Sequence, residues 1–253
     1  VNGIIFEWNP TTNTVTNQYY FEPLSATTLG QHPRGSLTLY NNKLYGATTY
    51  GGANSAGILF ESDPAGRRFL KKADFSPAVT GTYPASHLYL FEEKLYISTT
   101  DGGAFGKGAF TEFDPKTSSL RKLLDHRLKP GADPMALKNG NLYSASEAEM
   151  SMLEINIQTA TVMSYPAFFN HDINTPVSAL TLMGDTFYGV SYDHTYPQTK
   201  ADTSYIYQWV PGQRTLNRIA TFTPGEMGKD VSALYHLHGR LYGITDNGSR
   251  GGR

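Results

Sequence analysis

The sequence predicts an all-β propeller of five four-stranded blades, forming a single domain over residues 1–253. Three observations lead to this fold: a repeat of about fifty residues, strand-sized apolar segments joined by tight turns, and termini that each hold half a repeat. The composition agrees, because aromatic residues reach 13% and charged residues only 17%, which suits many short, half-buried strands. A large all-β fold can occupy 253 residues as one domain.

The repeat is clearest in two stretches that align without a gap. They are KLYGATTYGGANSAGILFESDP from Lys43 to Pro64 and KLYISTTDGGAFGKGAFTEFDP from Lys94 to Pro115. Weaker copies of the leading Leu-Tyr pair follow at Leu142-Tyr143, Phe187-Tyr188 and Leu241-Tyr242. A period near fifty is typical of propeller blades and not of helical repeats or leucine-rich horseshoes.

Each copy predicts four strands. An apolar segment and a turn precede every Leu-Tyr element, and Asn139-Gly140, Gly184-Asp185 and His238-Gly239 supply the positive φ angles that tight hairpins need. A polar loop, a third strand, a turn such as Asp63-Pro64 or Asp114-Pro115, and a fourth strand follow. Four antiparallel strands per repeat are the composition of a propeller blade.

The two termini together complete one blade. The segment GIIFEWNP from Gly3 to Pro10 matches GILFESDP from Gly57 to Pro64, so the chain starts with the second half of a repeat. It ends at Arg253 with the first half. Pairing of N- and C-terminal strands in one blade would close the ring and remove free sheet edges. The alternative is an excerpt from a longer array of six or more blades.

These residues carry a family resemblance. The pattern LYGxTxxGGxxxxGxLFxxDP, seen from Leu44 to Pro64, resembles the bacterial tandem repeats called GloVer repeats, which occur in large secreted and surface-anchored proteins. The segment FEWNPTTNTV from Phe6 to Val15 resembles the kelch propeller repeat. The chain departs from kelch because Gly51-Gly52 and Gly102-Gly103 lie in the loop after the second strand. The resemblance implies the fold and an extracellular or cell-surface location, with the periplasm as an alternative.

Charge and composition disfavour several function classes. The net charge is -1 and the basic residues are scattered, so the chain lacks the polybasic face that nucleic acid selects. No apolar run approaches the ~20 residues needed to span a bilayer, so we expect no membrane insertion. Cys is absent, which excludes disulfides and thiolate chemistry. The start at Val1 fits removal of a signal peptide and fits other starts equally well. The oligomeric state is left open.

Several recurring residues are explained by architecture. We expect Gly51, Gly52, Gly102 and Gly103 to provide backbone freedom in turns. The tyrosines of the Leu-Tyr pairs are interpreted as buried blade packing with satisfied hydroxyls, and Asp63 and Asp114 as turn residues. Trp8 and Trp209 occupy equivalent third-strand positions and are also expected to pack in a blade.

The candidate site lies on the loops that a propeller gathers around one end of its channel. A Gly-x-x-Pro pattern recurs at Gly30 to Pro33, Gly81 to Pro84 and Gly131 to Pro134, where the fourth strand of one blade leads to the first strand of the next. The connections between second and third strands reach the same end and contain Asp101 and His194. Residues of these two sets of loops without an evident structural role are the predicted ligand-binding residues: His32, Tyr83, Asp101, Asp133, His194 and Asp230.

Two function classes follow. The preferred reading is a non-catalytic binding module for a glycan or a protein partner, because aromatic faces stack on sugar rings and carboxylates bind hydroxyls. The alternative is a polysaccharide-active glycoside hydrolase or lyase with an acid pair from Asp133, Asp172 or Asp230. The apolar inner strands carry no acid, which disfavours an enzyme without excluding it. No cofactor is predicted, although the Asp246-Asn247-Gly248 loop leaves Ca²⁺ open.

Overall fold

The fold is described from a computed structural model. The structure describes residues 2–21, 29–64, 67–84, 87–127, 135–146, 150–166, 175–176, 179–193, 203–222 and 229–246. Within these ranges the side chains at 175–176, 192–193, 229–230, 232 and 246 are not described. The chain divides into two compact units, Val1–Arg127 and Leu128–Arg253, and each is described by itself.

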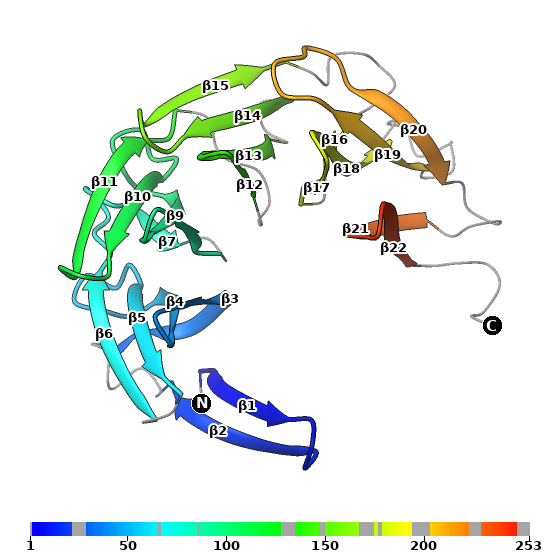
Figure 1. The fold of residues 1–253 in the computed structure, drawn as a ribbon. Helices are drawn as coiled ribbons and strands as arrows, with labels where there is room; N and C mark the ends of the chain where they lie inside the picture. The colour runs from blue at the N-terminus through cyan, green and yellow to red at the C-terminus, as the bar shows by residue number, and fades with distance from the viewer. Residues whose placement is uncertain are drawn as a thin grey trace. The chain divides into compact units, whose positions relative to one another are not determined.

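The first unit consists of antiparallel strands (Figure 1). One two-stranded sheet pairs β1 with β2, a four-stranded sheet has the order β3-β4-β5-β6, and a third sheet has the order β11-β10-β9-β7 with β8 also paired to β9. The strands are β1 (Ile4–Asn9), β2 (Thr14–Tyr20), β3 (Gln31–Tyr40), β4 (Lys43–Tyr50), β5 (Ile58–Asp63), β6 (Arg68–Asp74), β7 (Thr82–Pro84), β8 (Tyr89–Phe91), β9 (Lys94–Asp101), β10 (Ala109–Asp114) and β11 (Ser119–Asp125).

The second unit repeats this pattern. Its sheets have the orders β12-β13-β14-β15 and β16-β18-β19-β20, with β17 also paired to β18, and β21 pairs with β22. The strands are β12 (Ala136–Lys138), β13 (Asn141–Ser146), β14 (Ser151–Asn156), β15 (Thr161–Tyr165), β16 (Thr175–Pro176), β17 (Thr181–Met183), β18 (Thr186–Asp193), β19 (Thr203–Trp209), β20 (Asn217–Phe222), β21 (Lys229–Leu237) and β22 (Arg240–Asp246).

The predicted all-β class is confirmed, as is the prediction of four antiparallel strands per repeat. No α-helix occurs in the described ranges, and therefore none there is long and apolar enough to cross a membrane. The half-repeats at the two ends form the two-stranded sheets β1-β2 and β21-β22, as their sequences predict.

The β-bulges of the sheets recur with the sequence repeat. Between the third and fourth strands, the register shifts at the same repeat position in four sheets: after Ile5, Leu59, Phe110 and Ile206. A β-bulge leaves one residue unpaired and increases the local twist. Its recurrence indicates that one sheet geometry is repeated along the chain.

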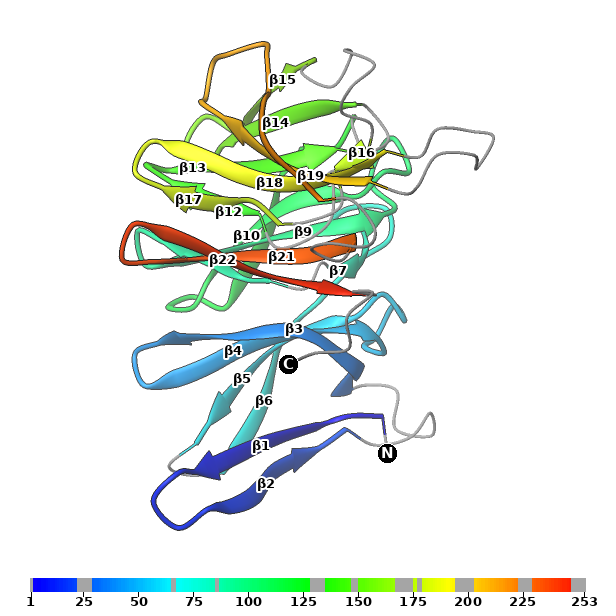
Figure 2. The ribbon, with the colours of Figure 1, turned by 90° about the vertical axis from the view of Figure 1, so that its right-hand side faces the viewer.

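The hairpin turns have the positive φ angles that the sequence predicts at Asn139-Gly140 and His238-Gly239, and at Gly184. Asn41-Asn42 and Glu92-Glu93 also have positive φ at both residues, although neither pair contains glycine. Two-residue hairpin loops with positive φ match the twist of the flanking strands. Figure 2 shows the β1-β2 and β3-β4 turns at the same end of the strands of the first unit.

Three tyrosines of the Leu-Tyr pairs are buried, as predicted, whereas Tyr188 is half-buried and Tyr242 is exposed. Tyr45, Tyr96 and Tyr143 each lie opposite a third-strand glutamate, and their hydroxyls donate to Glu61 at 2.8 Å, Glu112 at 3.3 Å and Glu154 at 3.1 Å. Burial raises the pKa of the Tyr96 hydroxyl, and the charge of Glu112 adds to the shift. The strongest sequence signal is therefore a packing and hydrogen-bonding element in these three sheets.

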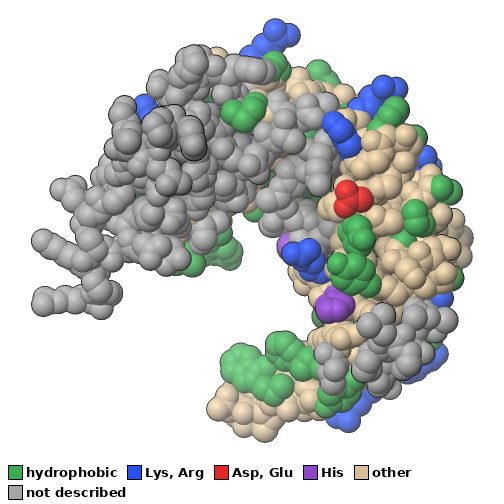
Figure 3. Space-filling model, turned by 180° about the vertical axis from the view of Figure 1, so that it is seen from behind, with side chains coloured by type: hydrophobic (Ala, Val, Ile, Leu, Met, Phe, Trp, Pro, Cys, Tyr) green, Lys and Arg blue, Asp and Glu red, His purple; other side chains and the backbone are tan. Residues whose placement is uncertain are grey.

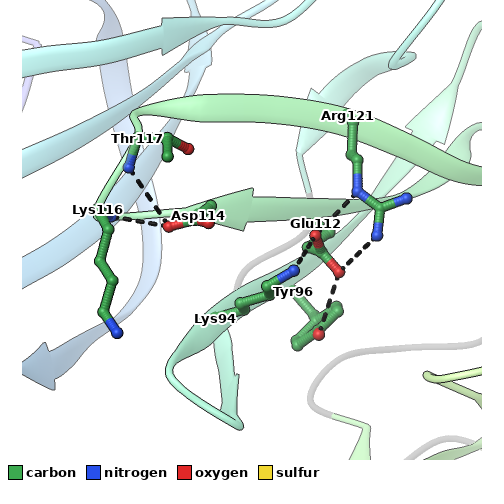
Figure 4. Close-up of polar contacts among 7 residues, drawn as sticks. All are labelled: Lys94, Tyr96, Glu112, Asp114, Lys116, Thr117 and Arg121. Carbon is green, nitrogen blue, oxygen red and sulfur yellow. Dashed lines mark hydrogen bonds and ion pairs between the residues drawn. The ribbon is translucent and has the colours of Figure 1, made fainter.

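Glu112 forms the most complete of these networks (Figure 4). Its carboxylate accepts from Arg121 Nε and Nη2, each at 2.9 Å, and from Lys94 Nζ at 2.8 Å. Burial alone would raise the pKa of Glu112, but these cationic donors outweigh burial and lower it. Asp114 in the same figure accepts from the backbone of Lys116 at 2.8 Å, which confirms it as a turn residue.

The paired glycines are structural, as predicted. All four have positive φ, and a Cβ on Gly51 would lie 2.7 Å from the Gly30 backbone. The loop after each pair is held by an aspartate that the sequence analysis did not single out. Asp74 Oδ1 accepts from the Ala53 N–H at 2.8 Å, and Asp125 Oδ1 accepts from the Ala104 N–H at the same distance.

The two tryptophans differ in environment. Trp209 is buried, stacks on Phe187, and its indole N–H donates to the Gln213 carbonyl at 2.9 Å. Trp8 is 54% exposed, and its indole N–H donates to Asn13 Oδ1 at 3.3 Å. The predicted packing in the core is confirmed for Trp209, whereas Trp8 lies exposed on the β1-β2 sheet.

Candidate functional site

Two of the predicted site residues have strained backbones. His32 has φ +54° and Tyr83 has φ +53°, at equivalent positions of the Gly-x-x-Pro pattern and each directly before a proline. A positive φ is uncommon for a residue with a side chain, and a proline favours extended backbone for the residue before it. Strained residues of this kind cost on the order of 1–3 kcal/mol each and concentrate at functional sites.

The glycines of the same pattern hold this strained segment close to the sheet. Gly30 and Gly81 both have φ +79°. A Cβ on Gly81 would lie 2.0 Å from Thr99 Oγ1, and one on Gly30 would lie 2.5 Å from Thr48 Oγ1. The pattern therefore requires glycine for a close approach, and it presents an exposed side chain two residues later.

The exposed rings of His32, Tyr50 and Tyr83 form a continuous group, here called the aromatic row. Tyr50 contacts His32 and Tyr83, in each case at 5.4 Å between ring centroids and in edge-to-face geometry. Tyr50 is 44% exposed and Tyr83 is 40% exposed. The row crosses from the end of β4 to β7 and so joins two neighbouring sheets of the first unit. Figure 3 views this end of the strands, where histidine, hydrophobic and acidic side chains follow one another across the described surface.

Asp101 lies beside the row. It is the last residue of β9 and pairs with Thr82 of β7, the neighbour of Tyr83. Its Oδ2 accepts from the Thr100 hydroxyl at 3.2 Å, and the same hydroxyl lies 3.4 Å from the Tyr83 carbonyl oxygen. The structure thus brings together three of the six predicted residues: His32, Tyr83 and Asp101.

The sequence placed these residues in loops, and this placement is corrected. His32 lies in β3, Tyr83 in β7 and Asp101 in β9, because the first strand of a blade extends back over the Gly-x-x-Pro pattern. Asp230 likewise lies in β21, although its side chain is not described. Asp133 and His194 lie outside the described residues, as do Asp172 and the Asn247-Gly248 part of the suggested calcium loop.

A pocket adjoins the row at His32 and Tyr50. It has a volume of about 460 Å³. The backbone N–H of His32 donates to the Asn2 carbonyl at 3.0 Å, which fixes the N-terminal residues along β3. Gly3 allows the close approach, since a Cβ there would lie 2.5 Å from Pro33. The pocket is lined by Asn2, Gly3, His32, Pro33, Arg34, Thr49 and Tyr50.

Of the seven lining residues, only His32 was among the predicted site residues. The side chains that the sequence did not predict for the site include those of Arg34, Thr49 and Tyr50. A signal was present for Arg34, because its repeat counterparts after the proline are the uncharged Ala85 and Met135. Where the repeated residues serve packing, a residue that departs from the repeat is a candidate for a functional role.

The pocket lining contains one histidine, His32, and no acidic residue. Across the described ranges there is no group of three or more His, Cys, Asp and Glu side chains that could hold a metal ion. What the site does present is aromatic surface, hydrogen-bonding groups and one guanidinium.

Comparison with solved structures shows similarity at low sequence identity. A chain in the crystal structure of a nidogen/laminin complex has a TM-score of 0.54 and 11% identity, covering 93% of this chain and 77% of that one. A chain in a Saccharomyces cerevisiae structure of a Dbp5 variant bound to Nup159, a Gle1 variant, IP6 and ADP has a TM-score of 0.45 and 9% identity, covering 87% of this chain and 53% of that one. The first likeness concerns the fold alone, and the second is too distant to argue from.

The sequence comparison identifies the family. No curated protein matches the chain. The family model of the Gloeobacter/Verrucomicrobia repeat matches residues 1–152, more than half of the length, including both strong copies of the repeat. The GloVer resemblance of the Leu44 to Pro64 pattern is thereby confirmed. The chain belongs to the Gloeobacter/Verrucomicrobia repeat family.

Proposed function

We propose that this chain is a non-catalytic binding module that recognises a glycan on the strand ends carrying the aromatic row. The observation that carries the proposal is the row itself, in which exposed rings are held by strained backbone at repeat-equivalent positions. Strain of this kind persists only where the surrounding structure enforces it, and it is frequent in ligand clamps.

The chemistry of the row suits a sugar. The faces of Tyr50 and Tyr83 offer apolar surface for the C–H face of a ring, and their hydroxyls can bind sugar hydroxyls. Asp101 adds an acceptor beside Tyr83. A protein partner on the same surface is the alternative, because exposed aromatic residues are also enriched in protein interfaces.

A glycoside hydrolase requires a pair of carboxyl groups, which the aromatic row does not contain. Glycoside hydrolases use two carboxyl groups about 5–9.5 Å apart. The pocket has no acidic lining residue, and Asp101 lies beyond it at the end of β9. This favours binding over catalysis at this site.

We further propose a secreted or cell-surface location, with the periplasm as the alternative, and neither nucleic acid nor a membrane as partner. The GloVer resemblance favours this location, because such repeats occur in secreted and surface-anchored proteins. The net charge of -1 favours the exclusion of polyanionic partners.

We propose that the complete architecture is a five-bladed propeller in which β22 pairs with β1. The repeat itself supplies the register. Tyr45 pairs with Glu61, Tyr96 with Glu112 and Tyr143 with Glu154. The same rule applied to the terminal halves places Tyr242 opposite Glu7, in the fifth blade.

The exposed side chains of the two half-blades support this closure. Phe6 and Trp8 on β1 are 60% and 54% exposed, and Tyr242 and Ile244 on β22 are 51% and 72% exposed. Large apolar residues on an unpaired strand are an aggregation hazard unless a neighbouring strand covers them. The kelch-like character of the Phe6 to Val15 hairpin belongs to the same proposal.

A glycan array probed with the whole chain tests the function, together with assays for polysaccharide cleavage. Selective binding of a saccharide without turnover supports the proposal. Turnover of a polysaccharide would replace it by the hydrolase or lyase alternative. Failure to bind any saccharide would leave a protein partner as the occupant of the row.

A further inference from the structure

The pocket beside the aromatic row differs in charge from the equivalent place in the next repeat. In the second repeat, Thr100 donates its hydroxyl to the carboxylate of Asp101 at 3.2 Å. The first-repeat counterparts are Thr49 and Tyr50, so the acid is replaced by an aromatic residue. The first repeat also has Arg34 where the second has Ala85. One repeat thus contains its own carboxylate, and the other lacks it and has a cation instead.

This exchange removes the carboxylate that accepts from the threonine hydroxyl in the second repeat. Thr49 lines the pocket and is only 7% exposed. Its hydroxyl forms no hydrogen bond with any residue that the structure describes, whereas the Thr100 hydroxyl is bonded. A ligand that offers an acceptor here would pair with this hydroxyl as the Asp101 carboxylate pairs with Thr100.

Arg34 supplies the complementary charge. It lines the same pocket, and its guanidinium forms no ion pair with a described residue. A guanidinium presents several N–H donors in a planar fork that matches a carboxylate or another oxyanion. The pocket holds no acidic residue that would compete for it.

The rest of the pocket lining fits a sugar ring that carries such an anionic group. Tyr50 contributes an exposed ring, and the volume of about 460 Å³ lies within the range of small-molecule sites. A free inorganic anion would use Arg34 and Thr49 but not the ring. An acidic saccharide would use all three.

We propose that this pocket binds an acidic saccharide, with its carboxylate or sulfate at Arg34 and the Thr49 hydroxyl and its ring against Tyr50. The inference rests on the proposed glycan-binding function and specifies the charge of the glycan. The anionic group of the ligand accepts from Thr49 as the Asp101 carboxylate accepts from Thr100 in the next repeat.

The test compares three oligosaccharides of equal length by isothermal titration calorimetry: a uronate, a sulfated sugar and the neutral parent. We expect the acidic ligands to bind about tenfold or more tightly than the neutral one, as one charge-assisted hydrogen bond allows. This preference should weaken as salt is raised, because the attraction is partly screened. Inorganic sulfate added alone should compete only weakly, since it cannot stack on Tyr50.

The variants separate the contributions of the residues. Arg34→Gln should reduce binding of the uronate to the level of the neutral sugar, and Thr49→Val should reduce it in part. Arg68→Gln is the matched control, because Arg68 is exposed at the start of β6 and does not line the pocket. It should change nothing.

The outcomes distinguish the inference from the function on which it rests. Equal affinity for neutral and acidic sugars, unchanged by Arg34→Gln, would overturn the acidic ligand while the glycan-binding function stands. Absence of binding to every saccharide would overturn both. Strong binding of inorganic sulfate with no gain from the attached sugar would show an anion site and contradict a saccharide site.

Discussion

His126 Nε2 lies 3.2 Å from Ser98 Oγ, and both residues are only 2% exposed. The equivalent residues of the preceding repeat are Phe75 and Ala47, which are also buried. One repeat therefore fills this place with an apolar pair and the next with a hydrogen-bonded polar pair.

The buried histidine predicts acid sensitivity. Burial lowers the pKa of His126 from 6.5 to about 4, and the negative charge of Asp125 offsets this only in part. The unfolded chain binds the proton more readily, so stability is intact above pH 6.5 and declines as the pH falls towards 4. One pKa unit corresponds to about 1.4 kcal/mol, so the loss approaches about 3 kcal/mol. Urea unfolding at several pH values measures it.

The preceding repeat provides the control. The double variant His126→Phe with Ser98→Ala copies the Phe75 and Ala47 pair into the second repeat. The free energy of unfolding of this variant should fall less between pH 6.5 and 4 than that of the parent chain. An identical pH profile for the two proteins would show that His126 is not the sensitive group.

The Glu112 network predicts a stability difference between Glu112 of β10 and Glu93 of the turn before β9. Glu112→Gln removes the charge that Arg121 and Lys94 bind in a buried position, and we expect a loss of about 1–3 kcal/mol. Glu93→Gln removes an exposed ion pair with Lys116 and should have little effect. Thermal and urea unfolding of the two variants are compared. Equal destabilisation by both would contradict the importance of the network.

Substitutions at two glycines of one loop allow the stability cost of backbone strain to be measured apart from the cost of a steric clash. Gly106 and Gly108 both have positive φ, but a Cβ on Gly108 would lie 1.9 Å from the Thr99 carbonyl oxygen, and one on Gly106 meets nothing within 4 Å. Gly106→Ala should cost about 1 kcal/mol. Gly108→Ala should cost clearly more, because the backbone itself must move. Their melting temperatures test this order.

The proposed closure predicts a cross-link. The chain contains no Cys, so Glu7→Cys with Tyr242→Cys introduces a single pair. Residues directly opposite on antiparallel strands have Cα separations of about 4.5–5.5 Å, which a disulfide can span. We expect oxidation to join the pair and to raise the melting temperature. Glu7→Cys with Ile244→Cys is the register control and should cross-link poorly.

Deletion of 1–21 tests the same closure without a new bond. Under the proposed closure, loss of the β1-β2 hairpin would leave β22 paired only with β21 and expose its other edge. The truncated chain should melt well below the full chain. Melting within about a degree of the full chain would contradict closure through the termini, since a mutational change of 1 kcal/mol already shifts the melting temperature by about 2–4 °C at this size.

Local patterns made much of the fold predictable. The Leu-Tyr pairs, the Asn-Gly turn and the Gly-Gly loops depend on neighbours within one repeat. The spacing of these residues in the sequence therefore predicts the strands and turns that they form. The burial of Tyr45 and the turn role of Asp114 follow from that repetition.

The site was less predictable because it depends on contacts between sheets. Tyr50 meets Tyr83 across two sheets, and no spacing rule gives that contact. The positive φ angles of His32 and Tyr83 were also unexpected, since a residue before proline normally favours extended backbone. Asp133 and His194 stay predictions.

The affinity of the Tyr83→Ala variant for the saccharide found on the array tests the central claim most directly. We predict binding weakened by about tenfold or more with a nearly unchanged melting temperature, because an exposed ring contributes more to ligand contact than to packing. The control is Glu92→Lys with Glu93→Lys, in the turn at the opposite end of β9, which should bind as the parent chain does. Loss of binding at this turn and none at Tyr83 would contradict the account and place the functional surface at the other end of the strands.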